Sequence, residues 1–223
     1  VLAEMAENRV SIAKEGGIGL LVALFNSGTE LSIEQALGAL IALAVENAEN
    51  QTAIADQAVT MLKNGSSMAQ EHVTELLRNL AQDPDNRLAI AKAGAVPELV
   101  RQLETGSEKA MMMASSGLAL IALKSEKIRT SVTNELVKLL GSNKEAVRKR
   151  ASEALTNMAS DETSTSTTRV SLTAKQGSAL VNLLKDGLKD GQVEAQEYAL
   201  RSLLNVIDRA AKEAIVEAGV IKP

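Results

Sequence analysis

LLRNLA, at residues 76–81, is one copy of a six-residue pattern that recurs along the chain about every forty residues. Asparagine fills the fourth position again in ALTNMA (154–159) and SLLNVI (202–207), whereas alanine fills it in ALIALA (39–44) and ALIALK (119–124). A second pattern alternates with the first and reads NRVSIAKEGGIG from Asn8, NRLAIAKAGAVP from Asn86, TRVSLTAKQGSA from Thr168 and KEAIVEAGVI from Lys212. Repetition at this period predicts a solenoid, in which each repeat buries its apolar face only against its neighbours.

The composition favours a helical protein with a core of small aliphatic side chains. Hydrophobic residues make up 45% of the 223 residues, but aromatic residues only 1%. The chain has no cysteine, which excludes disulfides, thiolate metal sites and cysteine nucleophiles and favours a cytoplasmic or nuclear setting. No apolar run approaches the roughly twenty residues that a membrane-spanning helix needs. We therefore expect no membrane span.

Charge is unevenly distributed along the chain. The net charge is −4, which argues against nucleic acid as the main partner. Residues 1–85 carry four Lys or Arg against twelve Asp or Glu, a difference of −8, whereas residues 86–161 carry twelve against eight, a difference of +4. Such polarity could orient a charged, extended ligand, although charge blocks on proteins are more often only solvated faces.

The repeat that starts at Asn8 predicts three helices. NRVSIAKEGG gives a short helix that ends at glycine, and IGLLVALFNSG gives a second helix whose apolar residues are Leu20, Leu21, Leu24 and Phe25. SIEQALGALIALAVEN gives a longer third helix. Its apolar residues cover a broad face, as expected of a helix that packs against its own repeat and both neighbours. They are Ile33, Ala36, Leu37, Leu40, Ile41, Leu43 and Ala44.

A short first helix, a Gly-Ile, Gly-Ala or Gly-Val turn, and an Asn near the end of the third helix resemble the armadillo repeat. The residues that carry the resemblance are Ile12, Ala13, Gly16, Gly17, Ile18, Ile90, Ala91, Gly94, Ala95, Val96, Pro97, Leu99, Val100, Ile215, Gly219 and Val220. The resemblance implies an all-α, right-handed superhelical α-solenoid of about five armadillo repeats. Their expected bounds, with partial units 1–7 and 210–223 at the ends, are 8–49, 50–85, 86–126, 127–161 and 162–209.

Three of these repeats depart from the pattern. The second and fourth, IADQAVTMLKNG from Ile54 and IRTSVTNELVKLLG from Ile128, lack the glycine turn, so we expect their first helix to be shortened or fused with the second. The fifth begins with the polar segment DETSTSTT (161–168), an expected exposed loop. Both chain ends fall inside repeats, which suggests a piece of a longer array. Open ends of this kind expose apolar surface that could self-associate end to end.

No pattern of catalytic residues stands out. The chain lacks GxxxxGK[ST], GxGxxG after a strand, HExxH and GxSxG, and its single histidine, His72, rules out histidine-rich metal sites. Glu71 and Glu75 lie one turn apart on an expected helix, and glutamates in such positions are ordinarily solvated surface residues. The basic cluster Lys144, Arg148, Lys149 and Arg150 has no interleaved aromatic residues for stacking on bases. We expect no enzyme activity and no cofactor or metal.

The armadillo resemblance implies a binding face on the third helices. In that family this face lines the concave groove, where the Asn amide pairs with the backbone of an extended peptide. Steps of four and seven residues back from each repeated Asn stay on the same face. The candidate peptide-binding or partner-binding residues are therefore Asn79, Glu75 and His72; Asn157, Glu153 and Arg150; and Asn205, Arg201 and Tyr198. In the other two repeats the matching residues are Ala42, Gly38 and Gln35, and Ala122, Leu118 and Ser115.

The chain has no Trp, which argues against the Lys-binding pockets of nuclear-import adaptors of this type. The Met111–Met113 run, which starts the third repeat's third helix, is expected to place one or two side chains in the core, the alternative being an adaptable contact surface. The hypothesis is a non-enzymatic scaffold that binds an extended peptide or partner protein. The alternative is a structural spacer or self-assembling segment whose groove binds nothing.

Overall fold

The computed structural model describes residue 3, residues 5–159 and residues 197 and 200. Within these residues the chain forms ten helices and no strand. It divides into two compact parts, Val1–Lys124 and Ser125–Pro223. The described residues are therefore all-helical, as predicted. The loop expected at 161–168 and the units expected after it lie outside the described residues.

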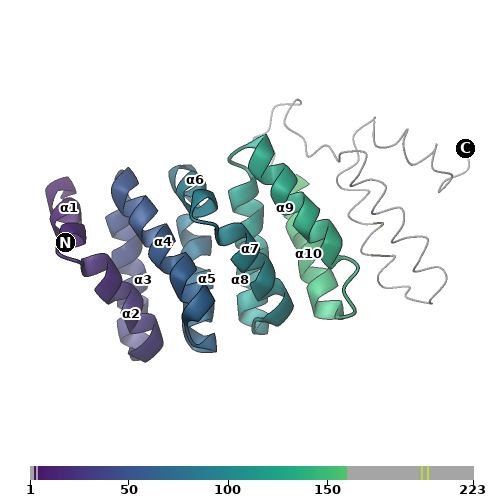
Figure 1. Ribbon diagram of the computed structural model, residues 1–223, viewed down its shortest axis with the longest axis horizontal. Coiled ribbons are helices and arrows are strands. Elements are labelled where there is room, and N and C mark those ends of the chain that lie inside the picture. The colour runs from purple at the N-terminus through teal and green to yellow at the C-terminus, as the bar shows by residue number, and fades with distance from the viewer. Residues whose placement is uncertain (1–2, 4, 160–196, 198–199, 201–223) are drawn as a thin grey trace, which may run out of the picture. The chain divides into compact units, whose positions relative to one another are not determined.

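The first part contains eight helices in its described residues (Figure 1). Their bounds are α1 Ala6–Lys14, α2 Gly17–Ser27, α3 Glu30–Ala44, α4 Ala48–Asn64, α5 Ser67–Leu80, α6 Pro84–Lys92, α7 Ala95–Thr105 and α8 Glu108–Ala122. In this view α2, α4 and α7 lie in front, and α3, α5 and α8 lie behind them. The latter three, with α10 in the second part, are the third helices of the repeats. Within the first part, α5 packs against both α3 and α8.

The glycine turns between first and second helices are confirmed. Gly16 and Gly94 adopt φ values of +82° and +86°, the left-handed region that glycine enters without a steric cost from Cβ. Each of these glycines precedes a second helix, α2 or α7. The turn lets the chain reverse sharply between a short first helix and the second.

The second and fourth repeats have a fused first and second helix, as the missing glycine predicted. α4 runs from Ala48 to Asn64 without a break, and α9 does so from Glu126 to Leu139. With no residue suited to a left-handed turn, the hydrogen-bonded helix simply continues. The expectation that fusion changes the rotation between repeats stays a prediction.

The packed face of α2 differs from the one expected. Ile18, Val22 and Phe25 are buried, but Leu20 is 71% exposed. α2 contacts α3, α4 and α5, so one side of it is covered. Leu20 lies two residues from both Ile18 and Val22, about 200° around the helix from each, and therefore points away from that side. The broad face expected for α3 is confirmed, with Ile33, Ala36, Leu40, Leu43 and Ala44 buried.

The polar dipeptide that opens several repeats caps the third helix before it. Asn50 Nδ2 donates to the carbonyl oxygen of Leu43 at 2.9 Å, and Gln51 Nε2 donates to that of Ala44 at 3.0 Å. Asn86 caps α5 in the same way, since its Nδ2 donates to the carbonyl oxygen of Leu80 at 3.0 Å. The last carbonyls of a helix have no partner within it, so these side chains satisfy groups that burial would leave unpaired.

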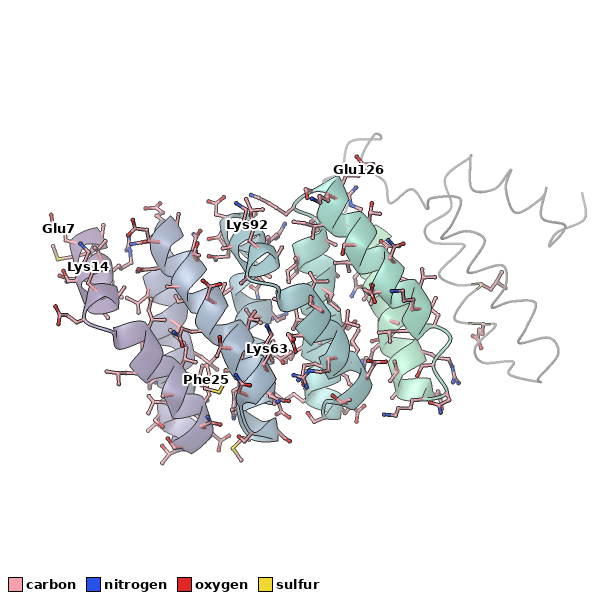
Figure 2. The ribbon with its side chains drawn as sticks, viewed as in Figure 1. Glu7, Lys14, Phe25, Lys63, Lys92 and Glu126 are labelled. Atoms are coloured by element: carbon pink, nitrogen blue, oxygen red, sulfur yellow. The ribbon has the colours of Figure 1, made fainter. Side chains whose placement is uncertain are left out.

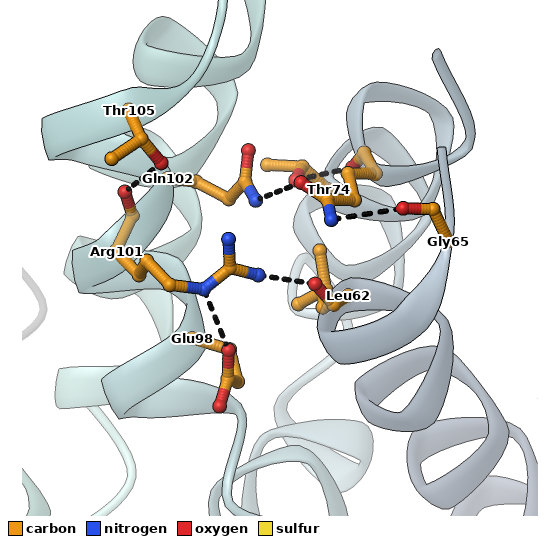
Figure 3. A network of polar contacts seen from close by, with 8 residues as sticks. Leu62, Gly65, Thr74, Glu98, Arg101, Gln102 and Thr105 are labelled. Atoms are coloured by element: carbon orange, nitrogen blue, oxygen red, sulfur yellow. Dashed lines mark hydrogen bonds and ion pairs between the residues drawn. The ribbon is translucent and has the colours of Figure 1, made fainter. Parts of the chain in front are cut away.

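Polar side chains also join consecutive repeats (Figure 3). The fully buried Gln102 donates from Nε2 to Gln70 Oε1 at 3.0 Å, and Gln70 Nε2 donates to the carbonyl oxygen of Gly65 at 3.0 Å. Arg101 pairs with Glu98 at 3.0 Å and also donates to the carbonyl oxygen of Leu62 at the end of α4. These directional contacts fix how α7 sits on α4 and α5, which apolar packing alone specifies less closely.

The second part is described through α9 and α10, where α10 spans Glu145–Ala159. The two helices pack against each other. Their buried apolar side chains include Val132, Leu136, Val147, Ala151 and Leu155. This arrangement of a long fused helix followed by a third helix matches that of α4 and α5.

Candidate functional site

The structure places His72, Glu75 and Asn79 along one side of α5, and all three are partly exposed. The ring of His72 packs against an aromatic side chain of the preceding repeat. Its centroid lies 6.3 Å from that of the fully buried Phe25 in α2, at an interplanar angle of 35° (Figure 2 labels Phe25). The contact ties α5 to the preceding repeat. The ring of His72 is therefore packed against the preceding repeat, which leaves it less free to contact a ligand than an exposed side chain.

Asn79 has one half of its amide fixed and the other half open. Arg78 Nη1 donates to Asn79 Oδ1 at 3.0 Å. The Nδ2 group of Asn79 makes no hydrogen bond within the described part of the chain. Because the carbonyl end is held by a charged donor, the amide donor is oriented before any ligand arrives. Such a donor can pair with the backbone carbonyl of a peptide.

Glu71 and Glu75 form an ion-pair cluster with the next repeat. Lys109 Nζ in α8 lies 3.0 Å from Glu75 Oε2 and 3.6 Å from Glu71 Oε1. Ser107, the N-cap residue of α8, donates from Oγ to Glu71 Oε2. The hydrogen bond with Glu75 is the main reason that the pKa of Lys109 is raised above its ordinary value, against a smaller opposing effect of burial. The two glutamates are thus not merely solvated.

The N-caps set the register of the third helices. Thr29, Ser66 and Ser107 each accept a hydrogen bond on the side-chain oxygen from the backbone N–H three residues later, so they are equivalent positions of α3, α5 and α8. Counting from these caps, the equivalents of Asn79 are Ala42 in α3 and Leu120 in α8.

The residues matched to α8 from sequence, Ser115, Leu118 and Ala122, are therefore two positions out of register. The structure buries all three, whereas Leu120 is partly exposed. The equivalents of His72, Glu75 and Asn79 in α8 are Met113, Ser116 and Leu120. The sequence match of ALIALK to ALIALA aligned Ala122 with Ala42, but α8 is apolar over most of its length, so a match shifted by two residues fits the apolar pattern as well. Only the burial of the side chains shows which alignment is right.

The methionine run of α8 contributes no fully buried side chain. Met112 is 44% exposed, and Met111 and Met113 are intermediate in exposure. The expectation that one or two of these side chains lie in the core is therefore wrong. Small residues take the packed side instead, among them Ala110, Ala114 and Gly117. A Cβ added at Gly117 would lie 3.6 Å from the Cα of Arg78, which shows how closely α8 approaches α5.

The equivalent residues of α3, Gln35, Gly38 and Ala42, line a surface hollow of about 960 Å³. α1 and α2 complete it through Ile12 and Leu21, and its walls also include Arg9, Glu34, Ala39 and Val45. No asparagine occurs in this register of α3. The row of binding asparagines predicted from sequence is thus represented by one residue, Asn79, in the described residues of the first part.

In the second part, α10 carries Arg150, Glu153 and Asn157 on one side. Arg150 Nη1 pairs with Glu153 Oε2 at 2.8 Å, and the Arg150 side chain is only 15% exposed. Asn157 is exposed. Arg148 is buried and donates to the carbonyl oxygen of Ser142 at 2.9 Å, so the basic cluster seen in the sequence is not one open patch. The third set, Asn205, Arg201 and Tyr198, lies outside the described residues.

In the described residues, no group of three or more His, Cys, Asp or Glu side chains is placed to hold a metal ion. None of the helices in that same portion of the chain combines the length and apolarity needed to cross a membrane.

Comparison with solved structures identifies the fold. One engineered protein of known crystal structure has a TM-score of 0.53 and 27% identity, with 96% of this chain and 88% of that chain covered. A designed armadillo repeat protein in complex with the peptide (KR)4 has a TM-score of 0.53 and 22% identity, with 92% and 90% covered. Computationally designed armadillo repeat proteins for modular peptide recognition give a TM-score of 0.51 at 22% identity, with 92% and 90% covered. No protein-family model and no curated protein matches the chain. The chain therefore has an armadillo-like repeat fold.

Proposed function

We propose that this repeat scaffold binds an extended peptide, or an extended segment of a partner protein, along the third helices. The observation that carries the proposal is the state of Asn79, whose oxygen is held by Arg78 and whose amide nitrogen has no hydrogen-bond partner among the described residues. A donor that is already oriented loses little further rotamer freedom when it captures a backbone carbonyl. Designed proteins with this fold recognise peptides, which supports the same use of the fold here.

The neighbours of Asn79 supply selectivity in this proposal. Glu75, one turn earlier on α5, presents a carboxylate that is 25% exposed beside Lys109. In the register of Asn79, α3 offers Ala42 and α8 offers Leu120, so the backbone donor is flanked by apolar contacts. On α10, Asn157 and Glu153 repeat the spacing of Asn79 and Glu75. Asn157, and by the sequence pattern Asn205, would act on the same ligand class.

A random-peptide display library tests the proposal. The full chain is used for selection, and each enriched peptide is then measured against Asn79→Ala, Asn157→Ala and the double variant. We expect a loss of about tenfold in affinity for a single lost backbone hydrogen bond. Asn64→Ala is the matched control, because Asn64 is an exposed asparagine at the end of the outer helix α4.

The outcome separates the hypotheses. Peptides that lose affinity in Asn79→Ala but not in Asn64→Ala support the proposal. If peptides bind the double variant as well as the parent chain, capture does not use the asparagines. If no peptide is enriched, the alternative of a structural spacer or self-assembling segment replaces this function. Circular dichroism of each variant, compared with that of the parent, excludes unfolding as the cause of lost binding.

A further inference from the structure

A second row of side chains crosses the third helices near their N-terminal ends, and the proposed function does not use it. Leu31 and Met68 are 67% and 63% exposed, although both are large apolar residues. Each lies two residues after its N-cap, Thr29 or Ser66, so the two occupy the same register of α3 and α5. Exposed apolar side chains repeated at one register are unlike the single scattered ones found on most surfaces.

The same row carries carboxylates. One turn after Leu31 and Met68 come Glu34 and Glu71, on the same side of their helices. Glu34 is exposed and has no ion-pair partner among the described residues. α8 has the inverse order, with Lys109 in the register of Leu31 and Met112 in the register of Glu34. We call these six residues the edge row: Leu31, Glu34, Met68, Glu71, Lys109 and Met112.

The N-terminal ends of α3, α5 and α8 lie at one edge of the first part, the lower edge in Figure 1, and the row belongs to the first turns of these helices. Ser107, the N-cap of α8, donates to Glu71 in the first turns of α5. Ser66, the N-cap of α5, donates from Oγ to Asn26 Oδ1, near the end of α2, at 3.1 Å. The row and the proposed site meet at Glu75, but Met68 lies eleven residues before Asn79, which corresponds to about 16 Å along α5.

We propose that the edge row is a docking surface for a basic segment with apolar side chains between its cationic ones. Charge complementarity selects this occupant. Glu34, Glu71 and the adjoining Glu75 outnumber Lys109 by three to one, and residues 1–85 as a whole carry four Lys or Arg against twelve Asp or Glu, a difference of −8. The exposed Leu31 and Met68 would contact the apolar side chains, and Met adapts to varied partners.

Lys109 gives this surface an internal competitor. Its ammonium group lies 3.0 Å from Glu75 and 3.6 Å from Glu71, where a cationic side chain of the partner would otherwise bind. The Lys109 side chain is 46% exposed, so it can be displaced without opening the core. The partner must therefore compete with Lys109 for Glu71 and Glu75 but meets Glu34 without such competition.

Fluorescence anisotropy with a synthetic peptide tests the proposal. The probe alternates lysine and leucine around a central proline, which prevents it from forming a helix, and the control peptide replaces each lysine by glutamate. We expect the full chain to prefer the lysine peptide by about tenfold or more, with a preference that weakens as salt is added. Equal binding of both peptides would overturn the proposal.

Matched variants locate the binding. Leu31→Ser with Met68→Ser should lower the affinity for the lysine peptide by about tenfold, since two apolar contacts are lost. Leu20→Ser removes an equally exposed leucine, but from α2, and should leave the affinity within about twofold. If the Leu20→Ser variant loses as much affinity as the double variant, binding is non-specific and the proposal fails. Because all three residues are exposed, these variants should fold, which circular dichroism checks.

Two further variants test the competitor and separate this surface from the proposed function. Lys109→Gln should raise the affinity several-fold, by about threefold or more, whereas Lys63→Gln, which removes the same charge from α4 (Figure 2), should raise it less. An equal rise in both variants would mean that only the overall charge matters.

Asn79→Ala should leave binding of the lysine peptide unchanged. If Asn79→Ala abolishes binding of the lysine peptide, the peptide lies along Asn79 and the edge row is not a separate surface. If library peptides bind Asn79→Ala as well as the parent chain, while the lysine peptide still loses affinity without Leu31, only the proposed function is refuted.

Discussion

Replacing Asn50 by alanine should destabilise the protein by about 2–3 kcal/mol. Asn50 is 3% exposed, and its Nδ2 donates to the carbonyl oxygens of Leu43, at 2.9 Å, and Arg9, at 3.1 Å. Leu43 lies one residue from the end of α3, so its carbonyl has no partner within the helix. Each buried acceptor left unpaired costs about 1–3 kcal/mol, with the lower end fitting Arg9, whose carbonyl keeps its bond within α1.

Asn86 provides an internal comparison for this estimate. It is buried at the equivalent position of the third repeat, but its Nδ2 donates only to Leu80, at 3.0 Å, and its Oδ1 is buried without a partner. Asn86→Ala removes one hydrogen bond and also removes an unsatisfied oxygen. The loss should therefore be about 1 kcal/mol, clearly smaller than that of Asn50→Ala.

Urea unfolding followed by far-UV circular dichroism measures both losses, with Asn64→Ala as the control. Asn64 is exposed at the end of α4, so its replacement should change the free energy of unfolding by less than about 0.5 kcal/mol. The reasoning is refuted if Asn50→Ala costs no more than Asn64→Ala, or if Asn86→Ala costs as much as Asn50→Ala. Either result would mean that the caps do not stabilise the stacked repeats.

Two other predictions concern a pair of glycines and one lysine. Gly117→Ala should stabilise the protein by about 0.5–1 kcal/mol, because alanine favours the helix and its Cβ would meet its nearest neighbours at an ordinary 3.6–3.8 Å. Gly94→Ala should destabilise the protein by about 1–2 kcal/mol, because φ is +86° at this position. Thermal unfolding of the two variants measures both effects. The raised pKa of Lys109 means that its pairing with Glu75 stabilises the fold below the ordinary pKa of 10.5 and loses that effect as the pH rises through the folded-state pKa. The difference in unfolding free energy between the parent and Lys109→Gln should be less than about 1 kcal/mol and should shrink above pH 10.5; a difference that grows with pH would contradict the ion pair.

The sequence determined the fold, because the relevant signals are local. The presence of glycine at Gly16 and Gly94, and its absence from the segments that became α4 and α9, decide where a helix turns and where it continues, since only backbone conformation is involved. The period of about forty residues with its apolar runs predicted stacked three-helix repeats, and the chain matches designed armadillo repeat proteins in fold.

Tertiary structure alone decided which side chains reach the open surface. The two-residue shift of α8, which exposes Leu120 in place of Ala122, and the exposure of Leu20 depend on which side of each helix its neighbours cover. The same holds for the pairing of Lys109 with Glu71 and Glu75, residues from different repeats. Apolar periodicity fixes a helix and roughly one face of it, but on helices that are apolar nearly all round, packing contacts choose the register.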